Sequence, residues 1–280
     1  MASESEPRAP ARGTGPGAEL LRLGRELAST GDAQVGGGFS GHPEADALLE
    51  SSPEAFLIGV LFTQGIPAER AWAGPWLLRE RLGHFDLTRL AGERAAVADA
   101  VAAPPALHRF IHTLPGWICD AAERVLSCYN GDASTIWAPG LSVAEVTNRL
   151  TEFRGIGPKK ATMAVEILRR HFRVPLTGVE DGSVAYDVHV RRVFLRTGLV
   201  DADTPDAVRA AAAAVCPDDP GMLDLATWLV GRTTCRPSHP QCDSCQLGHV
   251  CARLTCLDAR GVGVRRQSSE RSSSPESSFG

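Results

Sequence analysis

Four cysteines close to the C-terminal end of the chain have the spacing of a metal-binding loop. Six, two and five residues separate Cys235, Cys242, Cys245 and Cys251 in turn. Four thiolates can hold a [4Fe–4S] cluster or a structural zinc ion. Structural zinc sites commonly use two Cys-x2-Cys pairs, and this loop has one. The spacing alone therefore leaves both kinds of metal site open.

A glycine-containing turn in the middle of the chain is the second chemical signal. The segment 155–158, GIGP, permits a tight reversal, because glycine tolerates a positive φ and has no Cβ to clash. Pro158 suits the first turn of the helix that follows. Backbone N–H groups at a helix start attract an anion, and Lys159 and Lys160 add positive charge there. We therefore expect the turn to bind a phosphate of a nucleic-acid backbone.

The third signal is an acid, Asp187, in the segment YDVHVRRVFLR. Considered alone, this acid predicts only an N-cap for the helix after it. In one pocket with the Lys159 amine it could do more. A carboxylate stabilises a positive charge that develops on a substrate, and a lysine amine can attack a carbon atom.

These three segments, in this order, resemble the endonuclease III-like DNA glycosylases of the helix-hairpin-helix-GPD superfamily. FRGIGPKKA is similar to their helix-hairpin-helix, YDVHVRRVFLR to the segment with their catalytic aspartate, and GRTTC to the start of their iron–sulfur loop. The resemblance covers roughly residues 54–251. It implies an enzyme that flips an altered base out of double-stranded DNA and cleaves the N-glycosidic bond. It also implies a structural [4Fe–4S] cluster held by the four cysteines.

The resemblance assigns two catalytic residues. Asp187 would stabilise the positive charge that develops at C1′ of the sugar as the base departs. Lys159, two residues after Gly157, would attack C1′, form a Schiff base and permit strand cleavage by β-elimination, which is AP-lyase activity. Alternatively, Lys159 contacts a phosphate and the protein removes bases without cutting the strand. Asp181 is a rival acid, but only the residues after Asp187 match the spacing of the family.

The resemblance also implies contacts with DNA. Gln64 would fill the gap that the flipped nucleotide leaves, and Trp117 would wedge into the base stack or stack on a base. Gly59 stands about where adenine-removing relatives carry a catalytic Glu, which argues against adenine as the substrate. The other expected contacts belong to the hairpin and to the segment after the acid: Gly155, Ile156, Gly157, Lys160, His189 and Arg192.

The composition predicts an all-helical protein. Ala, Leu and Val dominate the 280 residues, only 6% are aromatic, and alternating β-branched runs are few. The net charge of −4 argues weakly against a nucleic-acid binder. However, residues 150–200 contain nine Lys or Arg and five acidic residues, and the distribution of charge matters more than its sum.

We expect a two-lobed, all-α helix-hairpin-helix glycosylase fold, with a helical barrel lobe, an iron–sulfur lobe and disordered termini. The barrel lobe is expected at 53–172, with the hairpin at 150–165. The iron–sulfur lobe is expected to combine an N-terminal helix within 18–52 with C-terminal helices and the cluster loop at 173–256. Composition predicts disorder at 1–17 and 257–280. The loop at 173–185 is longer than relatives usually have, and it lies beside the expected pocket.

No stretch of the chain approaches the roughly 20 apolar residues of a membrane span, and the first residues lack the apolar core of a secretory signal. We therefore expect no membrane partner and an intracellular monomer that acts on DNA, in the cytoplasm or nucleoid of a bacterium. Two alternative functions stay open. One is a monofunctional glycosylase for another altered base, including a phage-type modified base. The other is a non-catalytic DNA-binding module.

Overall fold

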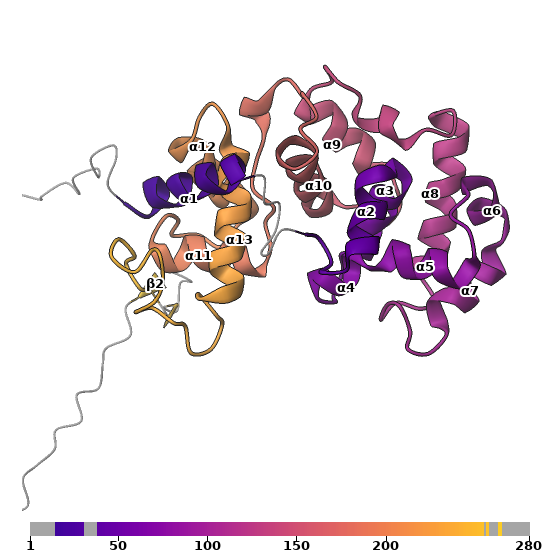
Figure 1. Ribbon diagram of the computed structural model, residues 1–280. Coiled ribbons are helices and arrows are strands. Elements are labelled where there is room, and N and C mark those ends of the chain that lie inside the picture. Colours follow the sequence, from indigo (N-terminus) through magenta and orange to yellow (C-terminus); the bar gives the residue numbers. More distant parts are fainter. Residues whose placement is uncertain (1–14, 31–37, 255, 258–262, 265–280) are drawn as a thin grey trace, which may run out of the picture.

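Helices make up nearly all regular structure in the computed structural model of the chain, which describes residues 15–30, 38–254, 256–257 and 263–264 (Figure 1). The helices of one lobe are α2 (Pro43–Ser51), α3 (Pro53–Phe62), α4 (Ala68–Trp72), α5 (Gly74–Leu82), α6 (Leu87–Gly92), α7 (Arg94–Ala102), α8 (Leu114–Cys128), the 3-10 helix η1 (Ala133–Trp137), α9 (Val143–Thr151) and α10 (Pro158–Arg170). The other elements are α1 (Pro16–Thr30), η2 (Val179–Asp181), α11 (Val188–Thr197), α12 (Pro205–Val215), η3 (Pro220–Leu223), α13 (Asp224–Thr233) and the strands β1 (Cys256–Leu257) and β2 (Gly263–Val264).

The barrel lobe is built around α3. Every residue from Ala55 to Phe62 is buried, so this helix is apolar on all sides and lies inside the lobe. Its start follows from the sequence, because the Ser52 side chain accepts a hydrogen bond from the Ala55 amide and Pro53 occupies the first turn. The surrounding core combines side chains from α2 to α10.

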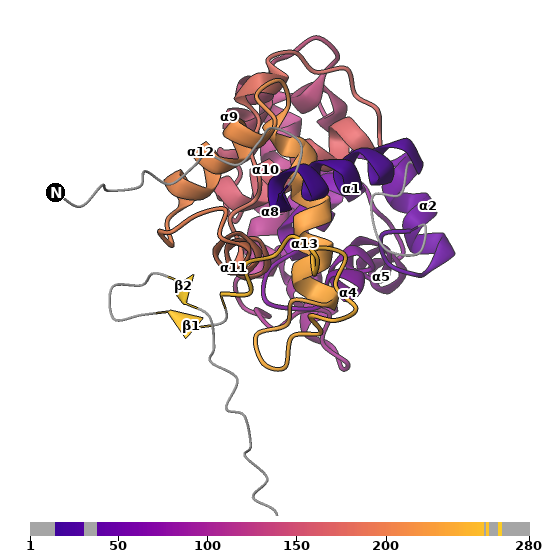
Figure 2. The same cartoon turned by 90° about the vertical axis from the view of Figure 1, so that its left-hand side faces the viewer.

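The second lobe brings the two ends of the described chain together. Although α1 comes first in the sequence, it packs against α13, η3 and α12 (Figures 1 and 2). A separate core forms there from residues of α1, α11, α12 and α13. The expected all-α, two-lobed fold is therefore confirmed. Within 18–52, however, α2 contacts α3 and α5 of the barrel lobe, because its apolar face carries Leu48 and Leu49 into that core.

The hairpin between α9 and α10 follows the local sequence closely. Ser142 and Glu145 form a reciprocal capping box at the start of α9. Gly155 adopts φ +94° and turns the chain, whereas Gly157 is extended and caps α10. The Ile156 side chain between them is 3% exposed, so it anchors the turn in the barrel core.

Most of the stretches expected to be disordered lie outside the described residues, namely 1–14, 258–262 and 265–280. Two parts of these stretches are ordered. The first helix begins at Pro16 and buries Gly17, and Cys256–Leu257 pairs antiparallel with Gly263–Val264. Among the described residues, no helix has both the length and the apolar character needed to cross a bilayer.

Replacing Gly155 tests whether the turn depends on glycine. In Gly155→Ala the new Cβ would lie 2.6 Å from the Trp117 ring at a backbone φ of +94°. We expect a loss of about 1–3 kcal/mol in the free energy of unfolding, measured by urea titration. Gly157→Ala is the matched control, since its Cβ would meet no atom within 4 Å. Equal stabilities of the two variants would contradict this account of the turn.

Candidate functional site

A cavity of about 640 Å³ lies between the two lobes. This volume falls within the range of small-molecule sites, about 300–1,000 Å³. Its walls come from α1, the turn after α3, α4, one face of α10, the segment 185–190, η3 and α13. Both Lys159 and Asp187 line it. The structure thus brings together the amine and the carboxylate that the sequence placed 28 positions apart.

Asp187 both caps helix α11 and lines this cavity. Its Oδ1 accepts hydrogen bonds of 2.8 Å from the amides of His189 and Val190, so it is the N-cap of α11. Both bonds use the same oxygen, and Oδ2 has no hydrogen-bond donor among the described residues. The cap therefore fixes the carboxylate and leaves an acceptor for a ligand. Asp181 is exposed in η2 and does not line the cavity.

The two neighbouring lysines of α10 point in different directions. The Lys159 side chain is exposed at the cavity. Lys160 is only 7% exposed, and its Nζ donates a 2.8 Å hydrogen bond to the Leu61 carbonyl at the end of α3. Burial, and then the charge of Lys159, lower the pKa of Lys160 to about 8. The expected contact between Lys160 and a phosphate does not fit this inward position.

The turn after α3 forms the rim of the cavity. Thr63 and Gly65 line it, and Gln64 between them is exposed. Gly59, one helical turn earlier, is buried, and a Cβ there would lie 2.8 Å from the Trp72 ring. Since Trp72 itself lines the cavity, an aromatic ring occupies the side of α3 where a Glu at position 59 would have to fit.

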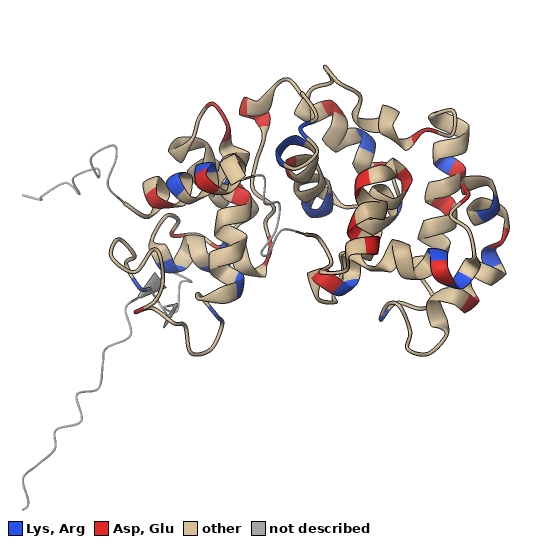
Figure 3. Cartoon of the chain, viewed as in Figure 1, with Lys and Arg blue, Asp and Glu red and all other residues tan. Residues whose placement is uncertain are grey.

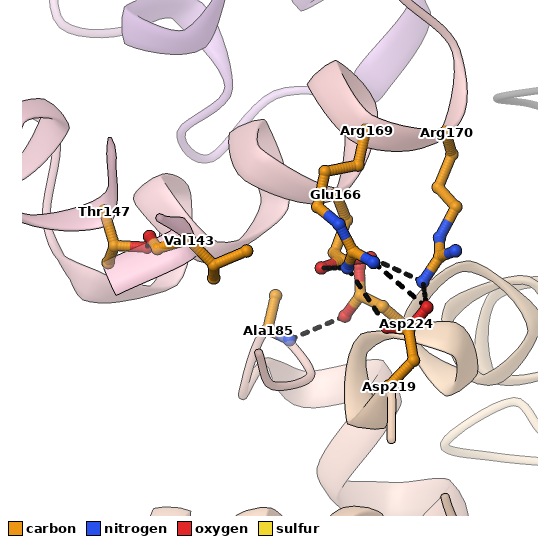
Figure 4. Close-up of polar contacts among 8 residues, drawn as sticks. All are labelled: Val143, Thr147, Glu166, Arg169, Arg170, Ala185, Asp219 and Asp224. Atoms are coloured by element: carbon orange, nitrogen blue, oxygen red, sulfur yellow. Dashed lines mark hydrogen bonds and ion pairs between the residues drawn. The ribbon is translucent and has the colours of Figure 1, made fainter. Parts of the chain in front are cut away.

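A buried ionic network joins α10 to the second lobe beside the cavity (Figure 4). Arg169 forms two hydrogen bonds with the Asp219 carboxylate, at 3.0 and 3.1 Å, and binds Glu166 at 2.8 Å. Arg170 binds Asp219 at 2.7 Å. Burial raises the pKa of Glu166 despite these guanidinium groups. For Asp219 burial acts in the same sense, but the hydrogen bonds from both arginines outweigh it and lower the pKa.

Comparison with known proteins finds two endonuclease III sequences that are similar to part of the chain. It is 28% identical over 133 residues to the endonuclease III of Thermotoga maritima, covering 47% of this chain and 56% of that protein. It is 30% identical over 112 residues to the endonuclease III of Rickettsia conorii, covering 39% and 48%. The chain spans about half the length of these curated relatives. No family model matches the chain.

Solved structures share its fold over most of their length. A trapped covalent intermediate of endonuclease III with DNA matches with a TM-score of 0.58 at 19% identity, covering 85% of this chain and 96% of that one. The chain is thus similar to endonuclease III in part of its sequence and in its fold. A thermostable thymine-DNA glycosylase also matches, with a TM-score of 0.56 at 11% identity and coverages of 85% and 94%.

Trp117 supports the hairpin from the barrel lobe. It lies inside α8, is partly buried, and its ring packs against Gly155. The Lys160 Nζ lies 5.9 Å from the ring centroid, so the ring also covers the buried ammonium. Its expected role as a wedge in the base stack would require these contacts to break.

Arg192 and His189 belong to α11 in the second lobe. The Arg192 guanidinium donates to the carbonyls of Val188, Gly231 and Cys235 at 2.6–2.7 Å. It therefore ties α11 to the end of α13, and its expected contact with DNA would require these bonds to break. His189 lines the cavity, with its Nδ1 3.1 Å from Arg192 Nη2.

The four cysteines of the expected metal loop surround one small cavity of about 30 Å³. All four are free thiols. Burial raises the pKa of Cys251, as does the negative charge of the other three cysteines. Four thiolates here would repel one another unless a cationic centre held them, and donors already approach the sulfurs, with the Arg253 amide 3.3 Å from Cys251 Sγ. Four cysteines are a donor set that fits a metal cluster. In the described part of the chain, however, no group of three or more His, Cys, Asp or Glu side chains is close enough to bind a single metal ion.

Sequence reasoning missed Asp224 and Glu166 as residues of the cavity wall. Asp224 shares a buried face of α13 with Thr227 and Gly231, at positions three and seven residues further on. This helical spacing is the signal that distinguishes Asp224 from the exposed acids before it in the sequence.

The buried amine of Lys160 predicts a pH-dependent stability. Between pH 8 and pH 10.5 the unfolded chain keeps a proton that the folded chain has lost, so the free energy of unfolding rises with pH. Relative to Lys160→Met, the wild type should gain up to about 3 kcal/mol over this interval. Urea unfolding of both proteins at neutral and alkaline pH measures the gain. Parallel pH profiles would show that Lys160 titrates as a solvated lysine.

Proposed function

We propose that the chain is a DNA base-excision glycosylase with associated AP-lyase activity. The observation that carries this proposal is the joint position of Lys159 and Asp187 on the wall of one cavity between the lobes. Its fold is that of a trapped endonuclease III–DNA covalent intermediate, and its similar sequences are named endonuclease III. The partner would be double-stranded DNA with an altered base flipped into the cavity.

The proposed chemistry uses the two side chains in sequence. As the C1′–N bond breaks, positive charge grows on the sugar, and the fixed carboxylate of Asp187 stabilises it. The amine of Lys159, after it has lost its proton, then attacks C1′ and forms a Schiff base, from which β-elimination cuts the strand. The N-cap bonds of Asp187 hold its carboxylate in place throughout, so no reorganisation is needed at the moment of bond breaking.

DNA binding would depend on few side chains. Lys and Arg mark both ends of α10 (Figure 3), but Lys160, Arg169 and Arg170 bind partners inside the protein. The exposed features near the cavity are the amide-bearing turn at Gly157, Lys159 and Gln64. We propose that Gly157 and Lys159 bind backbone phosphate and that Gln64 enters the space left by the flipped nucleotide.

Borohydride trapping on a panel of duplexes with altered bases tests the enzyme. The wild type should form a covalent adduct with DNA, and Lys159→Ala should lose it, because no amine then reaches C1′. Lys160→Met is the matched control and should still form the adduct, since that amine is held by the Leu61 carbonyl. Asp187→Asn should slow base release by about 100-fold or more.

The other outcomes of the trapping assay would each favour a different function or a different nucleophile. Base release without an adduct would favour a monofunctional glycosylase, with the exposed Lys159 as a phosphate contact. No base release from any duplex would leave a non-catalytic DNA-binding module as the better account. An adduct that survives in Lys159→Ala would place the nucleophile elsewhere.

We propose further that Cys235, Cys242, Cys245 and Cys251 hold a [4Fe–4S] cluster. When bound, the cluster would supply covalent cross-links between the end of α13 and the loop after it, and this role is structural. The fit rests on four thiols around one cavity. The Arg196 guanidinium, 3.7 Å from Cys235 Sγ, also binds the carbonyls of Arg236 and Pro237 and so orients this loop.

Metal analysis of the purified protein tests the cluster. The wild type should be brown, with iron and sulfide in equal amounts and broad visible absorbance. Cys245→Ser should lose the colour and part of its thermal stability. Cys128→Ser is the control, because Cys128 is exposed at the end of α8 and lies outside the cysteine cavity. Stoichiometric zinc without iron would instead identify a zinc site.

A further inference from the structure

We infer that Asp224 is the general acid that protonates the departing base. This inference rests on the proposed function and goes beyond it, because it gives the leaving group a proton donor. Asp224 begins α13 and lines the same cavity as Lys159 and Asp187, although it lies far from both in the sequence. The residue is 9% exposed, so its carboxyl belongs to the cavity wall.

A single hydrogen bond fixes this carboxyl. Its Oδ1 accepts the amide hydrogen of Ala185 at 2.6 Å (Figure 4). Ala185 stands two residues before Asp187, so the same short segment holds both acids on one wall of the cavity. With Oδ1 engaged as an acceptor, a proton on this carboxyl sits on Oδ2. Among the described residues, Oδ2 has no hydrogen-bond partner in the protein.

The surroundings keep that proton in place near neutral pH. Burial raises the pKa of Asp224 to about 7, and the charges of Glu166 and Asp187 act in the same direction. The Ala185 amide and Arg170 oppose them. The other charged or titratable groups that line the cavity are Lys159 and Lys160 of α10, His189 of α11 and Arg232 of α13, whereas α1 contributes only uncharged residues. The environment of Asp224 thus favours the protonated carboxyl that a proton donor needs.

A glycosylase needs such a donor because a base that leaves without a proton departs as an anion. In the step we assign, Asp224 Oδ2 gives its proton to a ring nitrogen or carbonyl oxygen of the base. The C1′–N bond breaks, its electron pair stays on the base nitrogen, and the base departs neutral. The positive charge on the sugar faces Asp187, and Lys159 or water captures C1′. Asp224 regains a proton from solvent after release.

Two rival donors in the cavity are engaged elsewhere, and a third is held at one nitrogen only. Lys160 Nζ binds the Leu61 carbonyl, and Glu166 binds Arg169 and packs tightly against the Gly221 backbone. His189 is the strongest rival, because only its Nδ1 is held, by Arg192. A proton donor at Asp224 implies one class of substrate. It is a base that carries a proton-accepting atom and that is a poor leaving group when it departs as an anion.

The variant Asp224→Asn tests whether Asp224 donates a proton or only supports the structure. The amide keeps an oxygen for the Ala185 N–H but has no proton to transfer. Single-turnover release of the base that the wild type excises should slow by about 100-fold or more below pH 7. The wild-type rate should fall about tenfold per pH unit above pH 7, as the acid loses its proton, and this decline should vanish in Asp224→Asn. Asp206→Asn, whose side chain is 90% exposed, is the control for the same chemical change.

A second duplex tests the acid without relying on one variant. If the excised base carries an electron-withdrawing substituent, it departs more readily as an anion. The wild-type decline above pH 7 should then weaken, and the difference between wild type and Asp224→Asn should narrow. This comparison also covers the case in which the variant folds poorly, since the wild-type profiles alone must differ between the two duplexes.

Three results would overturn the inference. Asp224→Asn could match the wild type within roughly threefold with the same pH profile. It could lose the same factor at every pH and on both duplexes, which would make Asp224 a positioning residue. His189→Gln could remove the pH-dependent decline while Asp224→Asn retains it. Failure of the wild type to release any base would instead show that the proposed function itself is wrong.

Discussion

The contact of α10 with Asp219 and Gly221, just before α13, is the constraint on which the shape of the cavity depends. Arg169 and Arg170 reach across the boundary between the lobes and bind Asp219. Glu166 packs so closely on Gly221 that a Cβ there would lie 2.3 Å from its carboxylate oxygen. Buried charges of this kind cost desolvation, and removal of one partner typically costs about 3–5 kcal/mol, because the others remain buried without compensation. The network therefore adds little net stability. Its main effect is to fix the distance between the two lobes.

That fixed distance gives chemically similar side chains different properties. Lys159 and Lys160 are adjacent in the sequence, yet one is exposed at the cavity and the other is bound to Leu61. Asp187 caps a helix at the cavity wall, whereas Asp224 is buried nearby against Glu166. A site that releases a base needs one carboxylate that stays charged and one group that keeps a proton. Burial raises the pKa of Asp224 and so suits it to keep the proton.

The same network changes how the positive charge of the chain should be interpreted. The excess of Lys and Arg between residues 150 and 200 is partly internal, since Arg169, Arg170 and Arg192 bind acids or carbonyls within the protein. The charges at the cavity mouth are correspondingly few. Contacts with a phosphate backbone would then come largely from main-chain N–H groups at the start of α10, which hold register on DNA without reading its sequence.

The sequence by itself determined the features that depend on neighbours in the chain: the all-α class, the caps at Ser52, Ser142 and Asp187, and the glycine turn before α10. It also named Lys159 and Asp187 as candidates for one site, and the structure places both on the wall of one cavity. Only the tertiary structure decided the direction of Lys160, the supporting position of Trp117 and the hydrogen bond between Asp224 and Ala185. Those outcomes depend on contacts between residues 99 positions apart, for Lys160 with Leu61, and 39 apart, for Ala185 with Asp224. No local spacing encodes such contacts, because the packing of whole helices brings the partners together.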